Sequence, residues 1–307
     1  MAQSVSFLMR LVRLVGIQPW LRLGLRRRLV RALFPEGTVS ERQFSTSFRG
    51  YRYDGSFSSN IDWQVFFFGG YELAELAVIE DVTAAIDGCV SLDVGANTGQ
   101  HALVMARHSA AVHAFEPFPL VRDLALGHLQ RNKLSHVTMH PFGLATEART
   151  ATYRFNSRSR NLGTGSFVGT HNSSADTEVN LEIRRGDDWF AGSGLPRADF
   201  VKIDVEGFEA EVVAGLQATL AAHQPVMMVE ITQSAVEGLE RRGGLSALLP
   251  YPVRLFRVLK PLPRAVLFSD GGYRLPPITE PKAEAASYNL LIVPESRLPT
   301  VGKLLPG

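Results

Sequence analysis

Acidic residues stand at the ends of four short apolar runs in this chain. They are Asp93, Glu116, Asp204 and Glu230. If the runs are parallel strands, their carboxyl ends meet at the edge of an α/β sheet where ligands bind. Burying an unpaired carboxylate costs several kcal/mol, so such a cluster needs cationic partners or a ligand. Singly, Asp204 could cap a helix and Glu116 could pair with a basic residue. Together they favour a site that accepts hydrogen bonds and takes up protons.

The turn after the first run has the spacing of a nucleotide-like ligand site. Asp93, Gly95 and Gly99 form the pattern Asp-x-Gly-x-x-x-Gly. A dinucleotide-binding site typically has the pattern Gly-x-Gly-x-x-Gly. Here Asn97 and Gln100 occupy the positions of its second and third glycines. The pattern fits S-adenosylmethionine (SAM) better, since SAM has no pyrophosphate that needs a glycine-lined helix start. An ordinary tight turn between a strand and a helix is the alternative.

Two further positions predict cofactor contacts. Glu116 lies about 20 residues past the glycine turn, where an acidic side chain accepts hydrogen bonds from ribose hydroxyls. Pro117 follows it and favours an extended backbone at Glu116. After the apolar run near 136–140, the side chain of Phe142 could contact an adenine ring.

The elements that must position these residues alternate between strands and helices. We expect strands near 90–94, 111–115, 136–140, 199–204 and 226–231, and helices near 71–86, 99–108, 118–131 and 207–222. This alternation predicts a parallel sheet with right-handed crossovers. The later apolar runs, 255–259, 265–268 and 288–293, suggest an antiparallel closing portion. After residue 231 the helix signal weakens.

Other segments are more polar or aromatic. Residues 46–68 alternate aromatic and polar groups and are expected to form short strands or loops. Extended segments at 153–155 and 179–183 flank a long polar loop, 156–175, whose length suggests a binding role.

The first 34 residues form a cationic segment with seven arginines and no Lys, Asp or Glu, which leaves 25 basic and 30 acidic residues for the rest. Apolar residues at helical spacing predict helices over 4–17 and 20–34. Three interpretations stay open. The helices could pack as a cap on the body or on another subunit, or 4–34 could lie on anionic lipid. A cleaved targeting peptide fits less well, because no clear cleavage site follows an uninterrupted apolar core.

Composition excludes several classes of protein. The single cysteine, Cys89, rules out an intramolecular disulfide framework and a cysteine-only zinc site. No apolar run reaches the length of a membrane span, so we expect a cytoplasmic protein, with the membrane surface as an alternative. The carboxylates could hold a divalent metal, but no compact ligand spacing is visible and no metal is expected.

The chain resembles the FkbM-like family of SAM-dependent methyltransferases over roughly 65–235. The segments that carry the resemblance are 68–72, 92–100, 114–117, 161–166, 200–209 and 224–230. The resemblance implies an α/β, Rossmann-like class I fold: a mostly parallel seven-stranded sheet with an antiparallel closing strand and helices on both faces. It implies SAM as donor and a hydroxyl acceptor on a sugar, glycan or secondary metabolite. We expect a leader at 1–45, an entry segment at 46–88 and the methyltransferase domain at 89–307.

The resemblance and the strand-end reasoning together give the expected site. The expected cofactor-binding residues are Tyr71, Glu72, Asp93, Gly95, Asn97, Gly99, Glu116, Phe142 and Asp204. The candidate catalytic bases, in order, are Asp204, Glu206 and Glu230. The histidines, such as His101, His140 and His171, cannot be ranked.

Two other functions compete with methyl transfer. A nicotinamide-dependent oxidoreductase would use the same strand edge, although Asn97 and Gln100 argue against it. A non-catalytic module that binds a membrane or a partner could keep the same fold, and a homo-oligomer is allowed. Nucleic acid is not an expected partner. The expected strand near 199–204 ends in Asp-Val-Glu-Gly, and the residues after position 34 are acidic overall.

Overall fold

The computed structural model describes residues 5–39, 43–159, 165, 167, 175–262 and 272–306. The predicted strand 265–268, most of the polar loop 156–175, the matching segment 161–166 except Gly165, and His171 lie outside the described residues.

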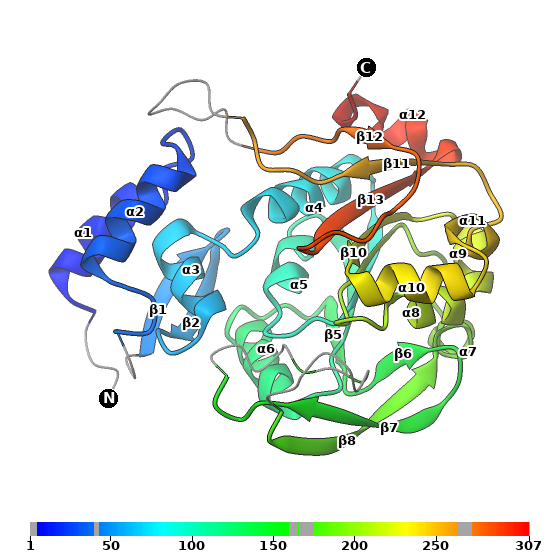
Figure 1. The fold of residues 1–307 in the computed structure, drawn as a ribbon, viewed down its shortest axis with the longest axis horizontal. Coiled ribbons are helices and arrows are strands. Elements are labelled where there is room, and N and C mark those ends of the chain that lie inside the picture. The colour runs from blue at the N-terminus through cyan, green and yellow to red at the C-terminus, as the bar shows by residue number, and fades with distance from the viewer. Residues whose placement is uncertain are drawn as a thin grey trace.

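A central sheet carries the five predicted parallel strands (Figure 1). These are β3 (Cys89–Val94), β4 (Ser109–Phe115), β5 (Val137–His140), β9 (Phe200–Ile203) and β10 (Val226–Ile231). The strand order is β5–β4–β3–β9–β10–β13–β11–β12. The register pairs Asp93 of β3 with Lys202 of β9. The strands that end in acidic residues are therefore neighbours.

The closing portion is antiparallel, as expected. β13 (Tyr288–Pro294) pairs antiparallel with both β10 and β11 (Val253–Arg257). The predicted Rossmann-like class I fold is confirmed. The sheet has eight strands where we expected seven, because the two-residue strand β12 (Pro277–Ile278) pairs with β11 at the edge.

Helices cover both faces of this sheet. They are α4 (Leu73–Ala85), α5 (Gln100–Met105), α6 (Pro119–Arg131), α8 (Glu209–Gly215), α9 (Gln217–His223) and α10 (Gln233–Arg241). Successive residues of one strand enter different cores: Met228 packs with α4 and α5 residues, whereas Val229 packs with α8 and α10 residues. Alternation of this kind is what a strand buried on both faces requires. Short helices α7 (Gly186–Ser193), α11 (Leu245–Leu248) and α12 (Leu298–Val301) and the 3-10 turns η2 (Glu295–Arg297) and η3 (Gly302–Leu304) complete this part.

Helix α10 follows β10 although the sequence signal was weak there. The hydroxyl of Thr232 caps it by accepting a hydrogen bond from the Ala235 N–H at 3.0 Å. Val236 and Leu239 bury its inner side. A cap and two buried side chains are enough to hold a nine-residue helix against the body.

A smaller three-stranded sheet flanks the main one. It consists of β6 (Gly143–Ala145), β7 (Arg149–Phe155) and β8 (Thr177–Arg185), in the order β6–β8–β7. The extended segments expected at 153–155 and 179–183 lie in β7 and β8. Tyr153, Phe155 and Leu181 pack there against Phe118.

The N-terminal part contains two helices, a hairpin and a third helix, on the opposite side of the molecule from α7 (Figure 1). They are α1 (Phe7–Gly16), α2 (Leu23–Leu33), β1 (Gln43–Phe48), β2 (Tyr51–Ser56) and α3 (Asn60–Phe68). The expectation of strands or loops up to residue 68 is wrong for α3. Ser59 caps this helix and Gly69, at φ 81°, ends it. Among the described helices, none has the length and apolar character needed to cross a membrane.

Candidate active site

The glycine turn after β3 lies directly against the end of β9. Gly95 has φ +88°, and a Cβ there would lie 1.8 Å from the carbonyl oxygen of Asp204. Only glycine allows this approach. The N–H groups of Gly95 and Ala96 both donate to the carbonyl of Phe115 at 3.0 Å. The ends of β3, β4 and β9 therefore meet at one point.

Glu116 lies at this junction, where its carboxylate is held by the backbone. It accepts hydrogen bonds from the N–H of Asn97 at 2.9 Å and of Phe118 at 2.8 Å. Burial raises the pKa of Glu116 to about 7, against the opposing effect of these two donors. The carboxylate is thereby fixed at the edge of a cleft, with lone pairs left for a ligand.

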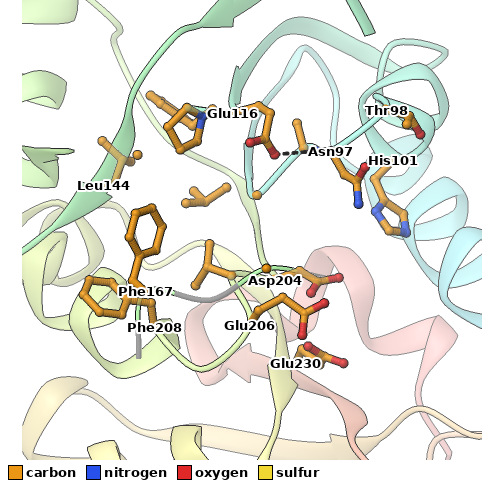
Figure 2. A pocket seen from close by; sticks show the side chains of 18 of the residues that line it. Asn97, Thr98, His101, Glu116, Leu144, Phe167, Asp204, Glu206, Phe208 and Glu230 are labelled. Carbon is orange, nitrogen blue, oxygen red and sulfur yellow. Dashed lines mark hydrogen bonds between the residues drawn. The ribbon is translucent and has the colours of Figure 1, made fainter. Parts of the chain in front are cut away.

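The floor of the cleft holds the three carboxyl groups expected to be catalytic: Asp204, Glu206 and Glu230 (Figure 2). The completely buried Lys202 donates from Nζ to Oδ2 of Asp204 at 2.7 Å. Burial opposes ionisation of Asp204, but the charge of Lys202 outweighs it and holds the pKa below its ordinary value. Asp204 is therefore the carboxylate that stays ionised.

The pKa values of Glu206 and Glu230 are shifted in the opposite direction from that of Asp204. Burial, followed by the charges of Asp204 and Glu209, raises the pKa of Glu206 to about 8. Burial and the charges of Asp204 and Glu206 also raise the pKa of Glu230. Near neutral pH, these two carboxyl groups hold protons in the ligand-free protein.

The entry to α4 supplies a second wall of the cleft. Gln100 clamps the backbone of Tyr71: its Oε1 accepts from the Tyr71 N–H at 2.7 Å, and its Nε2 donates to the Tyr71 carbonyl at 3.2 Å. The next residue, Glu72, has a left-handed backbone with φ 55°. Its Oε2 lies 3.5 Å from Nε2 of His101. Tyr71, Glu72 and His101 all line the cleft.

Three expected cofactor-binding residues do not line this cleft. Asp93 is completely buried behind it, and Gly99 caps the start of α5 with φ 82°. The expected adenine contact by Phe142 is not what the structure shows. Its ring is buried next to Phe115, with the Arg184 guanidinium 3.8 Å above its centroid. Phe142 belongs to the hydrophobic core, and the next two residues, Gly143 and Leu144, line the cleft instead.

A family model described as the methyltransferase FkbM domain matches residues 93–274, which is more than half of the chain. The chain belongs to the FkbM methyltransferase family. The hexuronic acid methyltransferase AglP of Haloferax volcanii is 29% identical over 128 residues, which cover 42% of this chain and 50% of AglP. The 2-O-methyltransferase NoeI of Sinorhizobium fredii is 27% identical over 189 residues, covering 58% of this chain and 76% of NoeI.

One solved structure similar to this chain is a methyltransferase FkbM from Methylobacillus flagellatus KT. It is 15% identical, with a TM-score of 0.41, over 67% of this chain and 43% of that one. The match to AglP likewise spans only half of that relative.

SAM is the methyl donor of the FkbM family, and the chemistry of the cleft fits it. Three buried oxygens at the cleft accept no hydrogen bond from a described residue: Glu72 Oε2, Asn97 Oδ1 and Glu230 Oε2. A ligand with a sulfonium, an ammonium and ribose hydroxyls brings the positive charge and donors that these oxygens lack. The pyrophosphate of a nicotinamide dinucleotide would instead meet carboxylates. The cleft has about 1040 Å³ of empty space, open solvent at its mouth included.

The remaining wall of this FkbM cleft is apolar and was missed by the sequence reasoning. Leu144 and Ile183 line it from the small sheet, and Phe167 and Phe208 lie together with ring centroids 5.4 Å apart. In Figure 2, Leu144, Phe167 and Phe208 lie to the left of the carboxyl groups of Glu206 and Glu230. Flat apolar walls suit an adenine ring. The one indication of this wall in the sequence was segment 161–166, which contains Gly165 and resembles the family.

A second, larger cleft joins the first at Tyr71, Glu72 and Glu230. Its empty space is about 2350 Å³. Arg22 and Arg27 of the α2 region also line it.

Among the described residues of this FkbM protein, no group of three or more His, Cys, Asp or Glu is placed to hold a metal ion.

Proposed function

We propose that this protein is an active SAM-dependent methyltransferase that methylates a hydroxyl oxygen, most simply on a sugar or glycan. The observation that carries the proposal is the set of three carboxyl groups, Asp204, Glu206 and Glu230, on the floor of the cleft. A hydroxyl nucleophile must lose a proton as it is methylated, so it needs a proton acceptor within reach.

Bound SAM supplies an electrophilic methyl group on a positively charged sulfur. The chain's own residues then have two tasks, which are to orient the acceptor oxygen and to take up its proton. Asp204 is suited to the second task because Lys202 keeps it ionised. Glu230 lies with Asp204 on the floor of the cleft, and the charge of Asp204 helps to keep Glu230 protonated.

The second cleft gives the acceptor a route to this point. It shares Glu72 and Glu230 with the cofactor cleft, so a bulky acceptor can reach the carboxyl groups without displacing SAM.

The names of two relatives support a sugar as the acceptor. AglP is described as a hexuronic acid methyltransferase, and NoeI as a 2-O-methyltransferase. By contrast, the acidic floor opposes a polyphosphate backbone, which disfavours a nucleic-acid acceptor.

Calorimetric titration with SAM and with NADH tests the cofactor part of the proposal. We expect SAM to bind the wild type and NADH not to. Glu116→Ala should weaken SAM binding about tenfold or more, since it removes a buried acceptor worth at least about 1.4 kcal/mol. Glu178→Ala, which removes an exposed carboxylate paired with Arg154, is the matched control and should bind SAM normally. Tight NADH binding without SAM binding would contradict the proposal.

Transfer of labelled methyl from SAM to a panel of hexuronic acids, neutral sugars and glycans tests the acceptor. Asp204→Asn should lower kcat by about 10²–10⁴-fold if Asp204 takes the proton. A product methylated on nitrogen would overturn the O-methylation part while leaving the methyltransferase intact.

A further inference from the structure

The outward face of helix α1 is apolar and uncovered. Five side chains, at positions 7, 8, 11, 14 and 15, lie on one side of the helix. Their exposed fractions are 82% for Phe7, 50% for Leu8, 49% for Leu11, 58% for Leu14 and 37% for Val15. The opposite side, with Met9 and Val12, is buried against the protein. Such a contiguous apolar face on an otherwise polar surface marks an interaction site.

Helix α1 is firmly attached through its inward side. The guanidinium of Arg13 donates to the carbonyls of Ser47 and Phe66, the latter in the last turn of α3. Arg26 of α2 donates to the carbonyl of Gly16 at 2.8 Å, at the end of α1. Two arginines therefore hold carbonyl groups at helix ends. The fold thus presents the apolar face in a fixed orientation.

Exposed positive charge lies on the same pair of helices as this face. Arg10 flanks it on α1, and Arg22 and Arg28 are exposed on the adjacent α2 segment. Trp20, which is 54% exposed, stands in the turn between the helices. No acidic residue occurs before Glu36, which pairs with Arg31 at 3.6 Å. Figure 1 shows α1 and α2 side by side at the margin of the molecule, away from the main sheet.

We propose that the α1–α2 pair docks on the surface of an anionic phospholipid bilayer. An apolar stripe bordered by arginines and a tryptophan is what the boundary between headgroups and acyl chains accommodates. Leu8, Leu11 and Leu14 enter this boundary, and the arginines contact the phosphate groups. The ten residues of α1 extend about 15 Å, so the helix lies in the interface and does not span the bilayer.

The positive charge of the α1–α2 pair favours an anionic lipid surface over a second copy of the chain as its binding partner. In a two-fold symmetric dimer, the same patch lies on both sides of the contact. The arginine-bearing patch of one copy would then face the same patch of the other, with no acidic residue of the helices between them. An anionic lipid surface pairs with these charges.

Flotation with lipid vesicles tests the proposal. Full-length protein is mixed with vesicles of phosphatidylcholine alone or of phosphatidylcholine with phosphatidylglycerol, at low and high salt. We expect binding to the anionic vesicles, weakened by salt because screening shortens the reach of the arginines. The variant Leu11→Asp/Leu14→Asp should bind at least tenfold more weakly, since it loses apolar burial. Arg10→Gln/Arg28→Gln should lose about fivefold for each arginine.

Helix α6 provides a matched control. Leu120 and Leu124 are 52% and 50% exposed, so Leu120→Asp/Leu124→Asp makes the same chemical change on another surface. It should bind vesicles as the wild type does. Calorimetric SAM binding checks that every variant is folded. The proposal is overturned if the wild type stays out of the anionic vesicle fraction, or if the control loses as much binding as the α1 variant. Light scattering that finds a dimer, broken by Leu11→Asp/Leu14→Asp, would assign the face to a second copy instead.

Discussion

The ammonium nitrogen of Lys202 lies 2.7 Å from Oδ2 of Asp204, and the lysine side chain is completely buried at the end of β9. Burial alone would lower the pKa of Lys202. The negative charges of Asp204 and Glu72 outweigh that effect and raise it. The pair therefore places one permanent positive charge beneath a cluster of carboxyl groups.

Removing that positive charge should destabilise the protein strongly. Lys202→Met keeps the length of the side chain but leaves Asp204 without its partner. We expect the free energy of unfolding to fall by about 3–5 kcal/mol, nearer the lower value because 23% of the Asp204 side chain remains exposed. Urea denaturation at neutral pH measures this loss.

Two variants make the result specific to the ion pair. Lys260→Met, at an exposed position, should change stability by less than about 0.5 kcal/mol. The double variant Lys202→Met/Asp204→Asn should recover part of the loss, since no unpaired charge remains. A loss below about 1 kcal/mol for Lys202→Met would show that Asp204 does not depend on this lysine.

Two glycines should respond in opposite ways to the same substitution. Gly95→Ala would place a Cβ 1.8 Å from the Asp204 carbonyl oxygen at φ +88°, so the turn must move and SAM binding should be lost. Gly192→Ala, in α7, meets no atom within 4 Å and should raise stability by about 0.4–1 kcal/mol. Thermal unfolding and SAM titration of both variants check this. Normal SAM binding by Gly95→Ala would show that the close approach is unimportant.

The sequence predicts well those parts of the site that follow from local patterns. The parallel strands are short apolar runs, and Glu116, Asp204 and Glu230 stand where such runs end, so their position at one sheet edge follows from topology alone. The FkbM resemblance then narrows the ligand to SAM.

The parts that were missed depend on tertiary packing. Helix α3 is buried almost all round, so its aromatic residues show no helical stripe. Its buried Asp62 is satisfied by the hydroxyl of Tyr53, at 2.6 Å on β2. Glu72 contacts His101 from a left-handed backbone, a conformation that the sequence pattern does not indicate. Phe142 stands just before the three-residue strand β6 and packs in the core beside Phe115, a contact between separate segments that the local sequence pattern does not reveal.

The ligand-free protein should become less stable as pH rises through neutrality. The pKa of Glu206 is about 8 in the folded state, far above that of an exposed glutamate, and those of Glu116 and Glu209 are about 7. Between about pH 6.5 and pH 8, the folded chain therefore binds more protons than the unfolded chain, and stability falls with pH. Below about pH 6.5 the lowered pKa values of His113 and His140, which follow from burial, act in the opposite direction. The lowered pKa of Asp204 acts only below about pH 4 and does not alter this range.

Urea midpoints at several pH values measure this slope, and Glu206→Gln should reduce it because the amide stays neutral. Glu237→Gln, on the exposed side of α10, is the control and should keep the slope of the wild type. A midpoint that rises with pH between about pH 6.5 and pH 8 would contradict the burial of these carboxyl groups as protonated acids.

Binding of SAM should release protons from the same groups. A cationic ligand beside Glu206 and Glu230 favours their ionised forms, so their pKa values fall when the complex forms. The affinity for SAM should then rise between about pH 6 and pH 8, by up to about tenfold per pH unit for each proton released. Calorimetry at pH 7 in two buffers of different ionisation enthalpy counts these protons directly. Glu206→Gln should release fewer protons than the wild type, whereas Glu237→Gln should release the same number. A binding enthalpy that does not depend on the buffer would mean that both carboxyl groups keep their charge state, and that SAM does not approach them.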